Sequence, residues 1–214
     1  LFMKIAIVKL SALGDIIHAM VVLQYIKKYN PAVEVDWVVE EAYKDLLKAH
    51  PDINNIITVN IKKAKKHKSL YLLYKELKKL RSFGPYDLVI DMQSLIKSAI
   101  ISRLIPSKVT LGFDNSSSRE SLASIFYNKT FKLSYDENII ERNFKLISFA
   151  LDLPVKLEEL SYKLPFLYSK KKYLNLSLSN FKKNIVLIPG ASFASKQYPI
   201  KNFAEVTHLL DANY

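Results

Sequence analysis

Short apolar runs alternate with longer segments of helical periodicity along the first 150 residues. Runs such as KIAIV and NIITV are rich in β-branched residues, as is typical of strands buried on both faces. The expected strands are Lys4–Val8, Val33–Val39, Asn55–Val59, Asp87–Met92 and Val109–Phe113. The expected helices are 16–29, 43–50, 68–81, 95–104 and 139–151. This alternation predicts an α/β domain with a doubly wound parallel sheet.

The alternation of apolar runs and helical segments stops after this domain and then resumes. Residues 154–183 contain two prolines and a lysine run but no long periodic segment, so we interpret them as a linker or a crossing between lobes. A strand is then expected at Asn184–Ile188 and a helix at 200–210. The expected organisation is a domain over 3–153, a crossing segment over 154–183, and the start of a second α/β domain over 184–214.

Composition and charge add one localised feature to this picture. The chain has a formal net charge of +12, of which residues 61–110 supply +9. Such a patch indicates a local anionic partner, either nucleic acid, a phosphorylated lipid or an anionic membrane surface, or else a solvated helix face. There is no cysteine, which excludes thiol chemistry and zinc–thiolate sites. No apolar run approaches the roughly 20 residues that a membrane span needs.

The first strand is followed by KLSALGD, the first of four loops that could carry chemistry. Gly14 permits close approach of a ligand to the backbone, and Asp15 lies next to it at the expected mouth of the sheet. The loop lacks G-x-G-x-x-G, so the fingerprint of a dinucleotide site is absent. Taken locally, Asp15 is more readily explained as the N-cap of a helix beginning at Ile16 than as a catalytic group.

Three further loops bring polar residues to strand ends. In DMQSLIKS, Asp91 is expected to be buried, with Gln93 and Lys97 closer to a cleft. Arg119 lies where a short helix is expected to begin, which indicates a nearby anion or a simple pair with Glu120 or Asp114. In PGASFASKQYP, small residues leave room for a ligand. In that loop Lys196 and Ser192 could bind phosphate, while capping by Ser192 or Ser195 is the plain structural alternative.

The four histidines show no metal-ligand spacing, and we predict no protein-bound metal and no Ser-His-Asp arrangement. Together the quoted loops resemble the bacterial lipopolysaccharide heptosyltransferases, in particular heptosyltransferase I. The resemblance covers most of the chain from Met3 and depends on MKIAIVKLSALGDIIHAM, VDWVVEE, YDLVIDMQSLIKSA, SRESLASIFYN and PGASFASKQYPIKNFAEV. It implies a GT-B architecture of two facing Rossmann-like domains.

The resemblance also implies an activity and its location. Members of this family transfer L-glycero-D-manno-heptose from ADP-heptose to Kdo of the lipid A inner core with inversion, at the cytoplasmic face of the inner membrane. No bound cofactor is implied, because ADP-heptose is the donor substrate. The implied partners are Kdo-lipid A and an anionic membrane surface rather than nucleic acid.

Roles for individual residues follow from matching positions in the family pattern. Asp15 matches the catalytic base, and in the donor loop Lys196 and Ser192 match phosphate-binding residues beside Gly190. The acceptor-binding region contains the lysines and polar residues Lys62, Lys63, Lys65, Lys66, Gln93, Lys97 and Arg119. Lysines partly replace arginines of the family, which retains charge but not bidentate recognition of phosphate.

One departure and one rival interpretation remain. The family's second domain carries a D-[ST]-G-x-x-H loop that binds the nucleotide sugar, and nothing here matches it. We therefore expect a chain that holds the acceptor domain and only the start of the donor domain, and that is inactive alone. The rival is a basic α/β module that binds nucleic acid through residues 62–79, which would leave the LGD and SKQYP loops unexplained.

Overall fold

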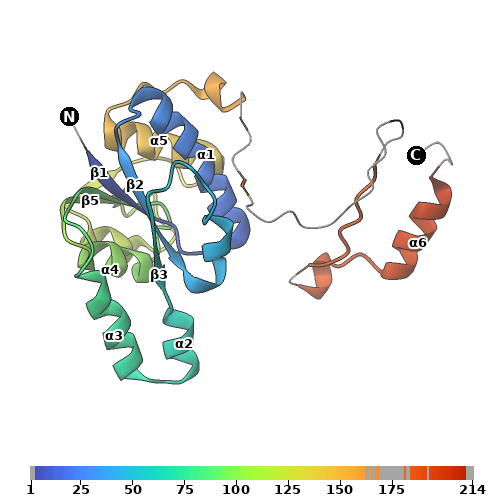
Figure 1. Ribbon diagram of the computed structural model, residues 1–214, viewed down its shortest axis with the longest axis horizontal. Coiled ribbons are helices and arrows are strands. Elements are labelled where there is room, and N and C mark those ends of the chain that lie inside the picture. The colour runs from blue at the N-terminus through green and yellow to red at the C-terminus, as the bar shows by residue number, and fades with distance from the viewer. Residues whose placement is uncertain are drawn as a thin grey trace. The chain divides into compact units, whose positions relative to one another are not determined.

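The computed structural model describes residues 3–161, 164, 167–168, 181, 184–191 and 193–210. It divides into two compact units, residues 1–170 and 171–214. In the described part of the first unit, parallel strands form one six-stranded sheet in the order β3-β2-β1-β4-β5-β6 (Figure 1). The strands are β1 (Lys4–Val8), β2 (Glu34–Glu40), β3 (Asn55–Val59), β4 (Tyr86–Asp91), β5 (Ser107–Phe113) and β6 (Lys129–Phe131). The predicted doubly wound α/β sheet is confirmed.

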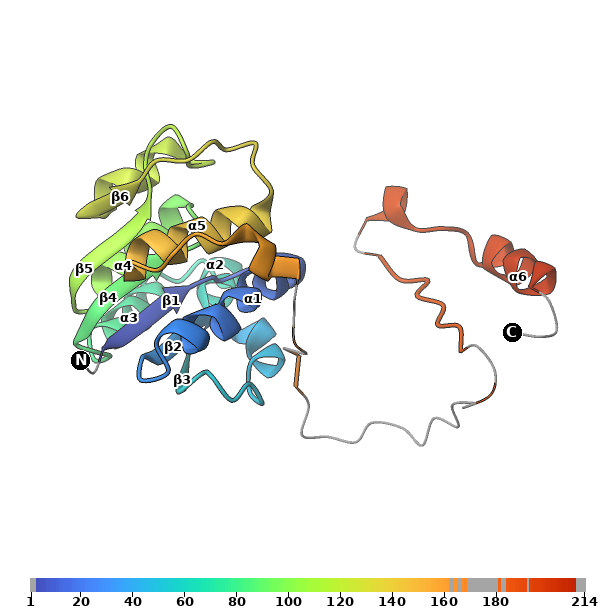
Figure 2. The same cartoon turned by 90° about the horizontal axis from the view of Figure 1, so that it is seen from above.

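Helices cover both faces of the sheet. The α-helices of this unit are α1 (Leu13–Tyr29), α2 (Ile61–Lys66), α3 (Leu70–Leu80), α4 (Ile96–Leu104) and α5 (Ile139–Leu151). Short 3₁₀ helices are η1 (Glu41–Leu46), η2 (Ser121–Phe126) and η3 (Leu157–Ser161). In Figure 1 α1 and α5 lie on one side of the sheet and α3 and α4 on the other, and Figure 2 looks onto the face that α1 and α5 cover.

Alternation along the strands divides the core into two layers. On β1, Ile5 and Ile7 pack with residues of α1 and α5, whereas Ala6 and Val8 pack with residues of α3 and α4. These four side chains of β1 are fully buried. This two-sided burial is the physical reason for the continuous apolar run in the sequence.

Strand order places the topological switch between β1 and β4. From β1 the chain proceeds outward through β2 and β3, then returns to β4 on the other side of β1 and proceeds outward to β6. In open α/β sheets, ligands bind where the strand order reverses, outside the carboxyl ends of the strands. The loops that follow β1 and β4 are two of the four loops that the sequence singled out.

Two expected helices differ from the observed ones, and one observed α-helix of this unit was not expected. Helix α1 begins at Leu13, not at Ile16, so Asp15 lies within the first turn and is not the N-cap. The segment expected to be helical at 43–50 contains part of the 3₁₀ helix Glu41–Leu46, the helix expected at 68–81 is confirmed as α3, and α2 was not expected. Helix α2 lacks an apolar stripe, since its sequence is IKKAKK, and therefore gave no periodic signal.

In the second unit the predicted strand at Asn184–Ile188 is wrong. Its described residues contain only η4 (Ala194–Lys196) and α6 (Ile200–Leu209) as regular elements. Val186 and Ile188 are 77% and 78% exposed. A parallel strand is stabilised by hydrogen bonds to a neighbouring strand. The described residues of this unit contain no strand with which Asn184–Ile188 could pair. The helix expected at 200–210 is confirmed.

Gly112 allows an aromatic ring to lie directly on β5. A Cβ atom built at Gly112 would come within 2.3 Å of the Tyr127 ring. From this position the Tyr127 hydroxyl donates to Asp91 Oδ2 at 2.8 Å, inside the core. Gly112 therefore fixes a buried hydrogen bond below the loop that follows β4.

Replacing Gly112 by alanine should lower the free energy of unfolding by about 1–3 kcal/mol, because the ring must move and its hydrogen bond to Asp91 is strained. Urea denaturation measures the change. Gly14→Ala is the matched control, since no atom lies within 4 Å of a Cβ at that position. It should be neutral or stabilise by up to about 1 kcal/mol, because alanine is the better helix former. Equal stability of both variants would contradict the proposed packing constraint.

Candidate active site at the sheet switch point

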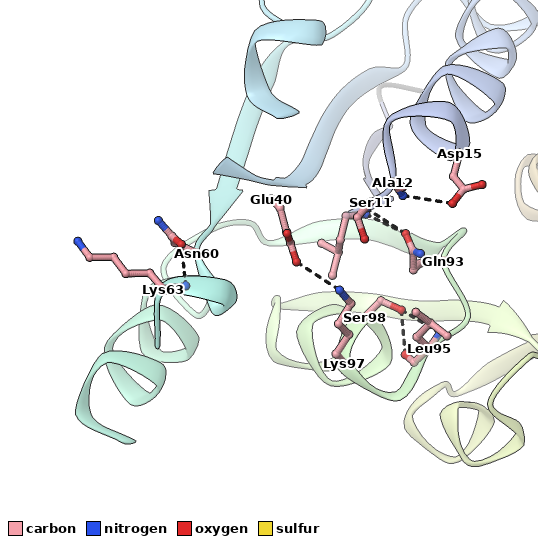
Figure 3. Close-up of polar contacts among 11 residues, drawn as sticks. Ser11, Ala12, Asp15, Glu40, Asn60, Lys63, Gln93, Leu95, Lys97 and Ser98 are labelled. Carbon is pink, nitrogen blue, oxygen red and sulfur yellow. Dashed lines mark hydrogen bonds and ion pairs between the residues drawn. The ribbon is translucent and has the colours of Figure 1, made fainter. Parts of the chain in front are cut away.

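The loop after β1 presents Asp15 at the carboxyl edge of the sheet. Asp15 occupies the third position of α1, where its Oδ2 accepts a hydrogen bond from the Ala12 amide at 3.2 Å (Figure 3). A carboxylate in the first helical turn is also favoured by the helix dipole. The other carboxylate oxygen makes no hydrogen bond to the described part of the chain. Asp15 can therefore stabilise the helix start and still accept a proton.

The loop after β4 is built around buried Asp91. The Asp91 carboxylate accepts from the amides of Gln93 at 2.8 Å and Ser94 at 3.2 Å, in addition to the Tyr127 hydroxyl. This side chain is completely buried, as the sequence predicted. It caps the turn that precedes α4 and does not reach solvent.

Gln93 ties the two switch-point loops together. Its Oε1 accepts from the amides of Leu10 and Ser11, each at 3.2 Å (Figure 3). These bonds cross from the β4–α4 loop to the β1–α1 loop. The side chain of Gln93 thus fixes the loop that carries Asp15.

A pocket of about 270 Å³ opens between these loops and the start of α5. Its charged residues are three cations, Lys9, Arg119 and Arg142, and two carboxylates, Asp15 and Glu137. Glu137 forms an ion pair with Lys145. The remaining lining residues are Met92, Gln93, Ser94, Leu95, Phe113, Tyr135 and Ile139. The surplus of positive charge makes the pocket suited to an anionic ligand placed beside Asp15.

Lys9 is a buried cation in the wall of this pocket. The residue is only 3% exposed, and its Nζ donates to the Met92 carbonyl at 2.7 Å. Burial lowers the pKa of Lys9, while the negative charges of Asp15 and Asp91 oppose that shift. Lys9 thereby places a positive charge close to the carboxylate of Asp15.

Arg142 stabilises another wall of the pocket. It projects from α5, is 4% exposed, and donates to the Ser117 carbonyl at 2.6 Å and to the Ser134 carbonyl. Its guanidinium lies 4.4 Å from the ring centroid of Phe113. These contacts connect α5 and β5 to the segment that carries Arg119.

Arg119 is exposed at the rim of the pocket, just before η2. The two carboxylates expected as simple partners are used elsewhere: Glu120 accepts from the Ile96 amide at 2.7 Å, and Asp114 accepts from Ser116 and Ser117. Arg119 forms no ion pair with the residues that the structure describes. This favours the interpretation in which Arg119 meets an external anion.

Three further predicted site residues whose side chains the structure describes in the first unit, Lys63, Lys66 and Lys97, do not line this pocket. Lys97 forms an ion pair with buried Glu40 at 3.2 Å, and Lys63 is exposed on α2 with its amide bonded to Asn60 (Figure 3). Lys66 is also exposed on α2, whereas the side chains of Lys62 and Lys65 lie outside the described part. In the second unit Lys196 and Gly190 are exposed, and Ser192 lies outside the described residues.

Sequence reasoning missed Lys9 and Arg142 as pocket residues. Lys9 directly follows the last residue of an apolar strand, a position where a charge is unusual and where a site is expected. Arg142 is likewise a charge on the buried face of α5, whose neighbours Phe144 and Leu146 are buried. In both cases a cation at a position predicted to be buried was the available signal.

Among the described residues, no three His, Asp or Glu side chains are grouped so that they could hold a metal ion. No helix in that part of the chain is both long and apolar enough to cross a membrane.

Comparison with known proteins connects the chain to sugar transfer. Residues 73–213 match glycosyltransferase family 9 (heptosyltransferase). Lipopolysaccharide heptosyltransferase 1 of Campylobacter coli is 38% identical over 213 residues, which is 97% of this chain and 60% of the relative. The enzyme of the same name from Pseudomonas aeruginosa is 35% identical over 156 residues, covering 72% of this chain and 44% of that protein. The chain thus spans about half to three fifths of the length of these relatives.

A solved structure shows the same fold. The E. coli heptosyltransferase WaaC with ADP superimposes with a TM-score of 0.79 and 26% identity over 97% of this chain and 64% of that one. The same enzyme with ADP-2-deoxy-2-fluoro heptose gives a TM-score of 0.80. With the family match over most of the sequence, these similarities establish that the chain belongs to glycosyltransferase family 9, the heptosyltransferases.

Proposed function

We propose that the chain is the acceptor-binding part of an inverting heptosyltransferase that moves L-glycero-D-manno-heptose from ADP-heptose to Kdo of the lipid A inner core. The observation that supports this proposal most directly is the position of Asp15. It lies at the switch point of the sheet, in a pocket that contains three cations. The printed names of the relatives, lipopolysaccharide heptosyltransferase 1, support the reaction class. No cofactor or protein-bound metal enters this proposal.

The chemistry requires a base and a means to stabilise the departing phosphate. An acceptor hydroxyl attacks the anomeric carbon of heptose from the side opposite ADP, and Asp15 takes its proton. Because the leaving group is a phosphate, no carboxylic acid is needed to protonate it. In this proposal Lys196 and Ser192 bind that phosphate, and Gly190 leaves room for it.

The acceptor is an anion, and the first unit supplies the matching charge. Arg119 and Gln93 border the proposed acceptor site, and open space around Gly14 permits close approach of a sugar to the backbone. Lys97, held by Glu40, is proposed as a further acceptor contact after rearrangement of that pair. The buried cation Lys9 places positive charge near the carboxylate of Asp15.

The proposal also assigns a role to each part of the chain. Residues 3–153 form the acceptor domain, residues 154–183 the crossing segment, and residues 184–214 the start of the nucleotide-sugar domain. The protein acts in the cytoplasm at the inner face of the inner membrane, to which it binds peripherally. The direct test is transfer of heptose from ADP-heptose to Kdo-lipid A by a full-length enzyme that contains this chain, read by mass spectrometry. Absence of the heptose-containing product under these conditions would contradict the proposal.

The lysines of α2 are proposed to bind the phosphates of the acceptor and the anionic membrane surface. Changing Lys62, Lys63, Lys65 and Lys66 together to alanine should raise the KM for Kdo-lipid A and change the KM for ADP-heptose little. At about 1 kcal/mol per lysine near an anionic surface, the expected effect is large. Steady-state kinetics of the full-length enzyme measure both constants. An unchanged acceptor KM with intact vesicle binding would make these lysines ordinary solvated surface.

A further inference from the structure

The core of the domain covers only some of the apolar side chains of helix α3. Leu77 and Leu80 pack against the core layer that contains Val59 and Ile101. At the N-terminal end of the helix, Leu70, Tyr71 and Tyr74 are 82%, 71% and 61% exposed. Leu70 and Tyr74 are four residues apart and so lie on one side of the helix, and with Tyr71 beside them they form an exposed apolar face. Leu70 is seven residues from Leu77 and so continues the same apolar stripe, but it lies beyond the part of α3 that packs on the core.

The surroundings of this exposed face are strongly basic. Residues 61–81 contain nine lysine or arginine residues and a single acidic residue, Glu76. Glu76 is turned toward the domain, where its Oε2 accepts from the Asn60 amide at 3.1 Å. Lys63, Lys66, Lys75 and Lys78 are exposed, and Lys78 Nζ lies 5.9 Å from the centre of the Tyr74 ring. The only negative charge is thus withdrawn from a surface that is otherwise cationic.

The position of these helices makes the face accessible. Helices α2 and α3 lie side by side beyond the carboxyl end of β3, at the edge of the first unit (Figure 1). We refer to residues 61–80 as the α2–α3 hairpin. Exposed aliphatic and aromatic side chains bordered by lysines are the features of a helix that lies in a membrane interface.

We propose that the α2–α3 hairpin attaches the protein to an anionic bilayer by inserting Leu70, Tyr71 and Tyr74 into the headgroup region. The lysines around them contact the anionic headgroups, and their methylene stems lie along the interface. This inference rests on the proposed function, because a membrane-embedded acceptor gives the attachment its purpose. It adds an apolar component to an attachment that the lysines alone would make purely electrostatic.

Both partners are anionic, and the type of the exposed side chains favours a membrane over a nucleic acid. Tyrosine rings can stack on bases, but Leu70, the most exposed of the three, has no aromatic face to offer. An aliphatic residue beside two tyrosines instead matches the interface between headgroups and acyl chains, where one end of tyrosine is apolar and the other is wet. The two partners also differ in salt dependence: contacts with phosphates weaken steeply with salt, whereas an inserted side chain does not release on screening.

The first test compares binding to vesicles. Vesicles of phosphatidylglycerol and phosphatidylethanolamine are sedimented with the 214-residue chain and with its Leu70→Ser/Tyr71→Ser/Tyr74→Ser variant, at low salt and at 0.5 M NaCl (about 4 Å Debye length). We expect the variant to bind at least about tenfold more weakly, with the larger relative loss at high salt. The matched control, Leu122→Ser/Ile125→Ser, removes two residues of η2 that are 62% and 71% exposed and should bind normally. Equal binding by the triple variant, or an equal loss in the control, overturns the proposal.

A fluorescent reporter tests insertion directly and does not depend on removing side chains. The chain has one tryptophan, Trp37, which is fully buried, so a Tyr71→Trp variant adds one exposed reporter. On vesicle binding its emission should shift to shorter wavelength and be quenched by brominated acyl chains. Binding without a shift or quenching would show attachment by charge alone and overturn the proposal. Saturable RNA binding that competes with the vesicles and vanishes at 0.5 M NaCl would also overturn it.

A separate readout distinguishes this inference from the proposed function. Transfer of heptose by the full-length enzyme to a water-soluble Kdo acceptor without acyl chains should be preserved in the triple variant, because that acceptor needs no membrane. Absence of transfer in the unmodified enzyme contradicts the proposed function while the vesicle result still stands. Loss of soluble-acceptor transfer only in the triple variant overturns the assignment of Leu70, Tyr71 and Tyr74 to the membrane.

Discussion

Asp15→Asn is expected to lower the kcat of heptose transfer by roughly 10²- to 10⁴-fold in the full-length enzyme, the usual contribution of a positioned base. Asparagine has nearly the same size as aspartate and can still accept the Ala12 amide through its carbonyl oxygen. The free energy of unfolding should therefore change by well under about 1 kcal/mol. The KM values for both substrates should be nearly preserved, because the lost interaction is made in the transition state.

Asp15→Ala separates the two roles of this side chain. Alanine removes both the base and the hydrogen-bond acceptor of Ala12, so this variant should lose activity and also about 0.5–2 kcal/mol of stability. Rates come from a coupled ADP-release assay, and stability comes from thermal unfolding. An Asp15→Asn enzyme that retains its kcat but melts several degrees lower would assign Asp15 to helix capping alone.

The second large effect is expected at Arg142. Changing Arg142 to methionine should lower the free energy of unfolding by about 2–4 kcal/mol. The variant loses two hydrogen bonds from a charged donor, to the carbonyls of Ser117 and Ser134, and leaves these acceptors without a donor. Ser117 is fully buried and belongs to the segment that carries Arg119. Loss of the hydrogen bond from Arg142 should therefore disturb the position of Arg119, so the KM for the acceptor should rise as well.

Arg103→Met is the matched control for this change, since Arg103 is an exposed arginine on α4. Its stability should stay within about 0.5 kcal/mol of the unmodified protein. Arg142→Lys retains the charge but cannot reach both carbonyls through one planar group, so an intermediate loss is expected. Urea unfolding of the three variants measures the order, and equal stability of Arg142→Met and Arg103→Met would contradict the assigned role.

The sequence predicted the residues at the sheet edge but not how they interact. Gln93 is an example: its position after a strand indicated a cleft residue, whereas the structure uses its Oε1 to hold the Asp15 loop. Lys97 is another, because its ion pair with Glu40 joins residues that are 57 positions apart. Pairings at such separations depend on strand order, which local periodicity does not encode.

Asp15 illustrates the same limit at short range. A helix start at Ile16 would make Asp15 an N-cap, but the observed start at Leu13 makes it a first-turn residue with one oxygen unengaged by the described chain. A helix start three residues earlier thus changes the structural role of the Asp15 side chain. Patterns of apolar spacing do not fix this boundary, since Leu13 and Gly14 extend the helix without adding to its buried stripe.

The sequence by itself determined the alternation of strands and helices, the parallel sheet, the family, and the basic segment, because each follows from local composition or from short ordered motifs. Only the tertiary structure decided that Lys9, Arg119 and Arg142 border one pocket with Asp15, and that Leu70, Tyr71 and Tyr74 are left uncovered. It also showed that Asn184–Ile188 forms no strand. The physical reason is common to all three: burial, charge proximity and strand pairing are properties of contacts between distant segments, and folding sets those contacts.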